Sequence, residues 1–228
     1  MILVLNCMME KNLATSFDKA ILRPIEKSGK KAEFVRVTGP EKLPDPSLYS
    51  HVILSGSEAS AINDMPWDNP LQEVIKQCVT LKKPFLGICY GHQFLAGTLA
   101  DRKQVVKAVT PEFGWTNIHL LSNPLFEGLP QNHISMVSHF DMVQQLPAEF
   151  NIIASSRLCN IHAYQYRDLP IWGLQFHPEY NADEAKEIFD ALHEEEPNFP
   201  SLYDASLLPM VNFAQNERIL LNFLTIHG

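Results

Sequence analysis

The sequence predicts an α/β protein with a mostly parallel open sheet, flanked by helices, and an antiparallel strand extension. The first hundred of its 228 residues alternate short apolar segments with amphipathic ones, an order typical of parallel sheets covered by helices. Short apolar segments separated only by turns follow, and these are typical of antiparallel strands. Because no repeat, low-complexity tract or linker interrupts the sequence, residues 1–228 are expected to form a single domain.

The spacing of apolar residues predicts the elements of the first half. Strands are expected at residues 2–5, 33–37, 51–54 and 84–88. Helices are expected at residues 13–28, 71–81 and 91–100. Pro24 should bend or shorten the first helix, and Gly29 should end it.

The second half begins with strands and returns to helix. The expected strands are residues 117–121, 134–137, 151–154, 161–165 and 171–175. Residues 184–223 are expected to be largely helical, with a break at Glu194-Glu195-Glu196-Pro197 and Pro200. A final helix is expected near residues 214–225.

Composition and charge exclude several classes of function. The formal net charge is −8, and no local run of Lys and Arg supplies the basic face that nucleic acids and anionic membranes require. No stretch reaches the roughly 18 apolar residues of a membrane-spanning helix, and no basic segment precedes the short apolar start as in a signal peptide. We therefore expect a cytoplasmic protein without a nucleic-acid or membrane partner.

The cysteine spacing gives no indication of a metal or redox site. The four cysteines are Cys7, Cys78, Cys89 and Cys159, and no two of them have CxxC spacing. The sequence therefore predicts reduced thiols, no metal and no cofactor.

Cys89 is the first candidate for catalysis. It lies in PFLGICYGHQFL, between an expected strand and an expected helix, with Gly87 and Gly91 two residues away on either side. Glycines permit a sharp turn there, and the unpaired N–H groups at the helix start favour a thiolate and a developing oxyanion. The alternative is a buried free cysteine, but the two glycines have no purpose in a hydrophobic core.

His177 is the candidate base for such a nucleophile, because a thiol needs a group that accepts its proton. It follows an expected strand in WGLQFHPEY, and Glu179 two residues later can fix the tautomer of its imidazole. The alternative is a strand-end histidine that faces solvent. His92 is adjacent to Cys89 in sequence but is expected to point along the helix, away from the thiol.

Together, PFLGICYGHQ and GLQFHPE resemble the motifs of the class I glutamine amidotransferases, and especially the amidotransferase part of GMP synthetases and its stand-alone relatives. The resemblance extends from the first strand to the last helix. It implies a flavodoxin-like fold and a substrate that is glutamine or another γ-glutamyl compound.

The resemblance also implies roles for individual residues. Cys89 would attack the side-chain amide of glutamine, His177 would transfer protons, and Glu179 would orient His177. Backbone N–H groups of Tyr90 and of the Gly56-Ser57 turn would bind the oxyanion. The residues that would hold the amino-acid end of glutamine are Gln93, Ser138, His139 and Phe140. For His139 the alternative is a loop residue that only packs.

The sequence departs from the family pattern in two places. The family turn often reads Ser-Gly-Gly-Pro, whereas this chain has Ser55-Gly56-Ser57-Glu58. If the turn requires positive φ at Ser57, that residue is strained and the oxyanion hole is less well formed. Residues 180–214 form an insertion before the final helix, expected to be either a solvated acidic excursion or a lid or docking element.

Three functions follow from these residues. The first is a glutaminase that supplies ammonia to a separate synthetase, because the sequence contains no phosphate-binding loop of the GxxxxGK[ST] type. The second is a stand-alone hydrolase of γ-glutamyl amides or peptides. The third is a catalytically silent binding or regulatory protein with the same fold, which only the altered turn supports.

Overall fold

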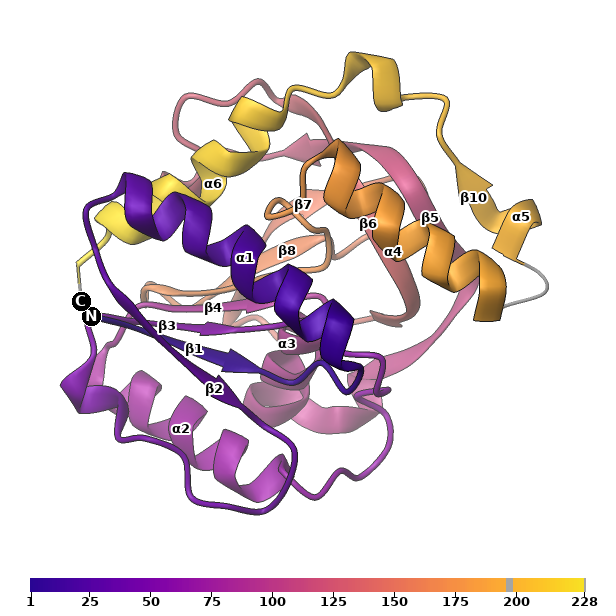
Figure 1. Ribbon diagram of the computed structural model, residues 1–228. Helices are drawn as coiled ribbons and strands as arrows, with labels where there is room; N and C mark the ends of the chain where they lie inside the picture. The colour runs from indigo at the N-terminus through magenta and orange to yellow at the C-terminus, as the bar shows by residue number, and fades with distance from the viewer. Residues whose placement is uncertain (196–198, 228) are drawn as a thin grey trace.

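The computed structural model describes residues 1–195 and 199–227, which form a mixed open sheet flanked by helices (Figure 1). The strands are β1 (Ile2–Asn6), β2 (Ala32–Arg36), β3 (His51–Leu54), β4 (Phe85–Ile88), β5 (Val105–Leu120), β6 (Asn132–Val143), β7 (Phe150–Ser155), β8 (Ala163–Tyr166), β9 (Ile171–Leu174) and β10 (Tyr203–Asp204). The α-helices are α1 (Lys11–Lys27), α2 (Asp68–Leu81), α3 (Tyr90–Ala96), α4 (Ala182–Glu195), α5 (Phe199–Leu202) and α6 (Phe213–Thr225).

The order of the strands confirms the predicted fold class. The sheet runs β10-β5-β7-β8-β9-β4-β3-β1-β2, and β6 pairs with β5 outside that path. Strands β2, β1, β3, β4 and β9 are parallel neighbours, whereas β9, β8, β7, β5 and β6 pair antiparallel. The order reverses beside β1, so the carboxyl ends of β1, β3 and β4 border the crevice in which such sheets bind ligands.

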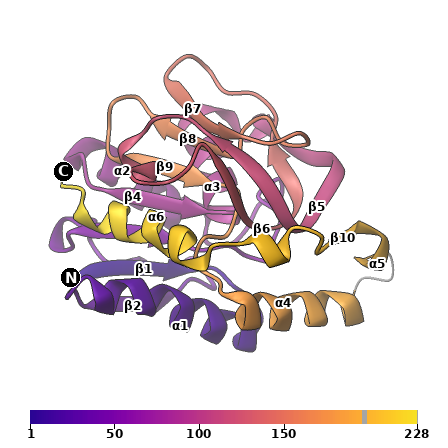
Figure 2. The ribbon, with the colours of Figure 1, turned by 90° about the horizontal axis from the view of Figure 1, so that it is seen from above.

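Alternating side chains of the parallel strands build two hydrophobic cores. In β1, Ile2 and Val4 belong to the core beneath α1, α4 and α6, whereas Leu3 and Leu5 belong to the core beneath α2 and α3. Figures 1 and 2 show these two sets of helices on opposite faces of the sheet. Because both faces are covered, the parallel strands are apolar at every position.

Helix α1 differs from its prediction at Pro24. The proline lies inside the helix, which continues to Lys27 instead of ending early. Gly29 then ends it as expected: it has a φ of 71°, and its N–H donates to the carbonyl of Glu26 at 2.9 Å. The N–H of Lys30 donates to Ile25, which completes a Schellman motif.

The antiparallel arm is longer than predicted. Strands β5 and β6 begin or end well outside residues 117–121 and 134–137, and their register shifts between Lys107 and Glu112. The outer part of β5 is half-exposed and lacks a regular apolar pattern, so apolar spacing could not reveal it.

Two further helices also differ from expectation. The helix expected at residues 91–100 is α3 followed by a π-helical turn at Gly97–Asp101. Within residues 180–214, α4 buries Ala185 and Phe189 in the core under α1, so this part is packed rather than a solvated excursion. Glu196 and Pro197 of the expected break lie outside the described residues. No helix in the described ranges is both long and apolar enough to cross a membrane.

Candidate active site

Cys89 occupies a strained turn between β4 and α3. Its φ of 50° and ψ of −103° lie in a region that residues other than glycine rarely adopt. The N–H of Cys89 donates to Leu174 at 2.7 Å, and the N–H of Gly91 donates to Ser55 at 3.1 Å. A Cβ on Gly91 would lie 2.5 Å from the carbonyl oxygen of Leu54, so the turn needs glycine there.

His177 and Glu179 form a buried pair beside Cys89. Nδ1 of His177 lies 2.8 Å from Oε1 of Glu179, and both side chains are at least nine-tenths buried. Burial alone would lower the pKa of His177, but the charges of Glu179 and Cys89 and hydrogen bonds to both raise it to about 10. At neutral pH the imidazole therefore carries a proton, an arrangement that suits a thiolate partner.

Backbone contacts bring His177 to the thiol. It follows β9 on the short segment after Leu174, and its N–H donates to Met136 of β6 at 2.9 Å. Gly56 lies against both reacting groups, since a Cβ there would be 3.4 Å from Cε1 of His177 and 3.7 Å from Cβ of Cys89. The structure thus brings together three segments that the sequence singled out.

Two polar groups contact the sulfur atom, and sequence reasoning missed one of them. Sγ of Cys89 lies 3.6 Å from the carbonyl oxygen of Ser138 and 3.7 Å from Nε2 of Gln175. Oε1 of Gln175 accepts from Nε2 of Gln93 at 3.0 Å, and that same nitrogen donates to the carbonyl of Asp141 at 2.8 Å. Gln175 directly precedes the FHPE residues, and its position at the end of the β9 segment was the only available signal.

The Ser57-Glu58 turn does not show the strain that was considered. Among the described residues other than glycine, positive φ occurs at Lys82, Cys89 and Arg167. Instead, Oγ of Ser57 donates to the carbonyl of Cys7 at 2.7 Å. The carboxylate of Glu58 accepts from the N–H groups of Met9 and Glu10 at 2.8 and 2.9 Å. The altered turn is therefore anchored to the segment between β1 and α1.

The candidate oxyanion groups lie at this same edge. Tyr90 is the first residue of α3, where an α-helix leaves its N–H groups without intrahelical acceptors. The Gly56-Ser57 turn follows β3 on the neighbouring strand. Tyr90 is also fixed by its hydroxyl, which accepts a hydrogen bond from Nε1 of Trp67 at 2.9 Å.

A pocket of about 330 Å³ opens over Cys89 and His177. All four predicted substrate-binding residues line it: Gln93, Ser138, His139 and Phe140. Its other polar lining includes Ser60 and the ion pair of Lys107 with Asp141 at 2.7 Å. Its other apolar lining includes Leu13, Phe113, Ile188, Ala191 and Leu192. Glu179 is not part of the lining and lies behind His177.

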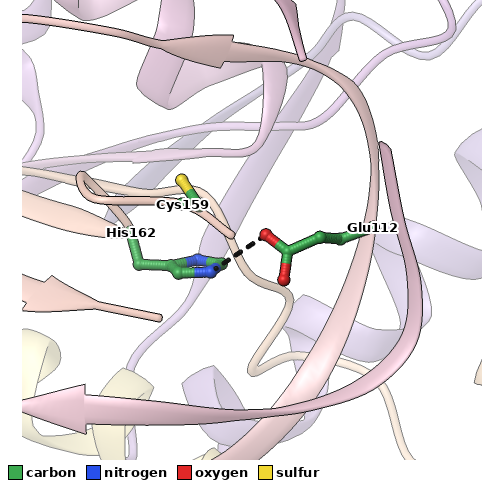
Figure 3. A group of neighbouring side chains, drawn as sticks. All are labelled: Glu112, Cys159 and His162. Atoms are coloured by element: carbon green, nitrogen blue, oxygen red, sulfur yellow. Dashed lines mark ion pairs between the residues drawn. The ribbon is translucent and has the colours of Figure 1, made fainter. Parts of the chain in front are cut away.

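A second group of chemically active side chains lies outside the predicted set (Figure 3). Glu112, Cys159 and His162 are buried, and one ligand-type atom of each lies within 4.8 Å of the others. Oε2 of Glu112 lies 3.4 Å from Nε2 of His162 and 3.4 Å from Nε2 of His139. Because these residues are far apart in the sequence, no motif spacing could have joined Glu112 to the other two.

Comparisons with known proteins agree with the geometry of Cys89, His177 and Glu179. A family model described as glutamine amidotransferase class-I matches residues 11–193. A glutamine-hydrolysing GMP synthase subunit of Methanocaldococcus jannaschii is 38% identical over 112 residues, which are 47% of this chain and 58% of that protein. The corresponding subunit from Methanothermobacter thermautotrophicus is 28% identical over 156 residues, 68% of this chain and 83% of that protein.

Several relatives are much longer than the matched region. The match with the GMP synthase of Caldicellulosiruptor saccharolyticus is 44% identical but spans 46% of this chain and 20% of that protein. The chain thus covers less than two thirds of the length of several of these relatives.

Solved structures show the same fold at low sequence identity. A glutamine amidotransferase of Thermotoga maritima has a TM-score of 0.78 at 23% identity, over 98% of this chain and 95% of that one. A glutamine amidotransferase of Methylobacillus flagellatus has a TM-score of 0.79 at 19% identity, over 100% of this chain and 95% of that one.

Proposed function

Because the chain belongs to the class I glutamine amidotransferase family, we propose that it hydrolyses the side-chain amide of glutamine through Cys89, His177 and Glu179. The observation that carries this proposal is the strained turn that holds Cys89 beside the buried pair of His177 and Glu179. A strained nucleophile next to an oriented histidine is the arrangement that acyl transfer requires.

The first half of the reaction forms a thioester. The Cys89 thiolate attacks the amide carbon of glutamine, and negative charge develops on the amide oxygen. The N–H groups of Tyr90 and of the Gly56-Ser57 turn stabilise that charge. The protonated His177 then donates its proton to the departing nitrogen. The carbon–nitrogen bond breaks, ammonia leaves, and a γ-glutamyl thioester remains on Cys89.

The second half of the reaction regenerates the enzyme. His177, now neutral, takes a proton from a water molecule that attacks the thioester carbon. The carbon–sulfur bond breaks, glutamate leaves, and Cys89 and His177 return to their starting states. Glu179 holds the imidazole in one tautomer and stabilises its charged form throughout.

The amino-acid end of glutamine would bind along Gln93 and the segment from Ser138 to Phe140. Nε2 of Gln93 already donates to Gln175 and to the carbonyl of Asp141. Its Oε1 is therefore the atom we assign to the α-ammonium group of the substrate. This arrangement would align the γ-amide with the sulfur atom of Cys89.

A glutamine analogue that carries a diazoketone in place of the amide tests the nucleophile directly. We expect it to alkylate Cys89 alone, and we expect excess glutamine to protect that residue. The other cysteines, Cys7, Cys78 and Cys159, are fully buried and serve as internal controls in the same peptide map. Labelling of another cysteine in the folded protein, or labelling that glutamine does not slow, would contradict the assignment.

We further propose that the ammonia is used by a separate synthetase. The printed names of the relatives from M. jannaschii and M. thermautotrophicus describe them as one subunit of a glutamine-hydrolysing GMP synthase. Glutamate release by the purified chain, measured with and without a nucleotide synthetase and the substrates of that synthetase, tests this. We expect a clear increase when the partner is present, and equal rates would contradict the proposal.

The apolar side of the pocket favours a second candidate, a stand-alone hydrolase of substituted γ-glutamyl amides. Ile188, Ala191 and Leu192 of α4 form an apolar wall with Leu13 and Phe113, far larger than departing ammonia needs. The carbonyl carbon has two substituents, and the charged amino-acid half requires the polar side of the pocket. The leaving group would then face the apolar wall. Such an enzyme would prefer amides with an apolar nitrogen substituent.

A series of γ-glutamyl alkylamides distinguishes the two candidates. For the stand-alone hydrolase we expect kcat/KM to rise about fourfold with each added methylene, because burying one contributes about 0.8 kcal/mol. Leu192→Asp should lower kcat/KM for the butylamide far more than for glutamine. Lys186→Ala, an exposed position on the same helix, is the matched control. If kcat/KM falls with each methylene, the second candidate is wrong and the glutaminase remains.

A further inference from the structure

We propose that Glu112, Cys159 and His162 form a binding site for one zinc ion beneath the floor of the pocket. Zinc in proteins takes thiolate, imidazole and carboxylate ligands, and three protein ligands of these kinds make a recognised site. The cluster supplies one of each, and all three residues are buried. This inference does not depend on the proposed hydrolysis of glutamine.

The segments that carry the ligands converge from two directions (Figure 3). Glu112 comes from the inner part of β5, next to the register shift. Cys159 and His162 come from the turn between β7 and β8 and are three residues apart, a spacing that lets one short turn supply two ligands. Hydrogen bonds from the N–H of Cys159 to Oγ of Ser156, at 3.1 Å, and from the N–H of Ser156 to the carbonyl of Cys159, at 2.8 Å, close this turn.

The separations between ligand atoms suit an ion better than direct hydrogen bonds. Oε2 of Glu112 lies 3.4 Å from Nε2 of both His139 and His162. A charge-assisted hydrogen bond would bring these atoms to about 2.7–2.9 Å. Two ligand atoms that each lie about 2.0–2.1 Å from a tetrahedral zinc ion are about 3.4 Å apart.

Several donor atoms here have no hydrogen-bond partner in the described part of the chain. They are Oε2 of Glu112, Nδ1 of His162 and Nε2 of His139. Unpaired buried polar atoms are costly, and a bound ion is one way in which proteins satisfy them. Oγ of Ser156, 3.0 Å from Nε2 of His162 and 3.4 Å from Oε1 of Glu112, would have to yield to the ion or orient its ligands.

The charges balance when zinc binds. The Cys159 thiol would lose its proton to solvent as the zinc–sulfur bond forms, and Glu112 is the second anion. One thiolate and one carboxylate neutralise the two charges of Zn²⁺, which a buried site requires. His139, which lines the pocket and already approaches Oε2 of Glu112, would occupy the fourth position. The ion would thereby join β5, β6 and the β7–β8 turn.

Cobalt substitution tests the site without measuring activity. Cys89→Ala protein, which lacks the active-site thiol, would be titrated with Co²⁺ and followed by absorption spectroscopy. We expect saturation at one equivalent, with visible bands of tetrahedral cobalt and a near-ultraviolet thiolate-to-cobalt band. Adding Cys159→Ser should remove the near-ultraviolet band. Adding Cys78→Ser, at a buried cysteine of α2, should leave it unchanged.

A second measurement covers the case in which Cys159→Ser fails to fold. Zinc should raise the Tm of wild-type protein, and Glu112→Gln should abolish most of that rise. The proposal is overturned if cobalt does not bind at one equivalent. It is also overturned if the thiolate band persists without Cys159, or if zinc raises the Tm of Glu112→Gln as much as that of the wild type.

Discussion

At the scale of single residues, the strained backbone of Cys89 is what presents the sulfur atom to the pocket. A positive φ at a non-glycine residue costs about 1–3 kcal/mol. The turn is held in spite of this cost by the hydrogen bond from Cys89 to Leu174 and by the close approach of Gly91 to Leu54. The surrounding parallel strands therefore fix the nucleophile before any substrate binds.

The pair of His177 and Glu179 leads to a graded prediction. His177→Asn should lower kcat for glutamate release by roughly 10²- to 10⁴-fold, because no other group can carry the proton. Glu179→Gln should lower it less, since the segment around His177 is still held by its bond to Met136. Steady-state kinetics with glutamine would measure both. A larger loss for Glu179→Gln than for His177→Asn would contradict these roles.

The sequence was sufficient for the candidate residues that lie in local motifs. Cys89, His177 and Glu179 each belong to a short segment with a recognisable pattern, and the structure brings the segments together. Gln175 and Glu112 could not be singled out, because their significance depends on contacts between β9, α3 and β5. Pairings of that kind follow from the fold and not from local spacing.

At the scale of elements, the junction of β4 and α3 depends on glycine. Gly91→Ala would place a Cβ 2.5 Å from the carbonyl oxygen of Leu54, and backbone atoms cannot easily move away. We expect a loss of at least about 2 kcal/mol in the free energy of unfolding, measured with urea.

Gly29→Ala is the matched control for that substitution. Gly29 has a φ of 71°, but nothing lies within 4 Å of a Cβ built on it. Its replacement should cost only about 1 kcal/mol, from backbone strain alone. Equal losses for the two variants would show that the close approach at Gly91 is not what constrains the turn.

Elements with strong apolar periodicity were predicted well, and the others were not. Strand β3 has the predicted bounds, and α2 begins three residues before them. Strand β10 was missed because its two residues pair with β5 only through a distant contact at Phe113 and Gly114. The same holds for the outer half of β5, where pairing with β6 rather than burial defines the strand.

At the scale of the whole molecule, buried histidines make stability depend on pH. Burial lowers the pKa of His51 to about 4 and that of His92 to about 3, from an ordinary value of 6.5. Above pH 6.5 both residues are neutral in the folded and the unfolded states. Below it the unfolded state binds protons first, so the free energy of unfolding should fall as pH decreases from about 6.5 to about 4.

Urea unfolding at a series of pH values measures this effect. The slope between pH 6 and pH 4.5 should correspond to the uptake of about one more proton in the wild type than in His51→Leu. His51 packs edge-on against Phe223, so leucine keeps an apolar contact at that position. Identical slopes for the two proteins would contradict a neutral buried His51.

The overall architecture was predictable from the sequence, whereas the shape of the pocket was not. The alternation of strands and helices indicated the parallel half of the sheet and placed the site at its carboxyl edge. The apolar wall depends on how α4 packs beside α1 and against the core, which no local pattern in residues 180–214 showed. The same segment decides between the two candidate functions.

Glutamate release by purified wild-type protein and by Cys89→Ala tests the central claim most directly. The substrates would be glutamine and the γ-glutamyl amides, with circular dichroism to show that both proteins are folded. We predict that the wild type releases glutamate and that Cys89→Ala releases none above the buffer rate. Release that survives in folded Cys89→Ala, or no release by the wild type from any of these substrates with or without a synthetase, would contradict it.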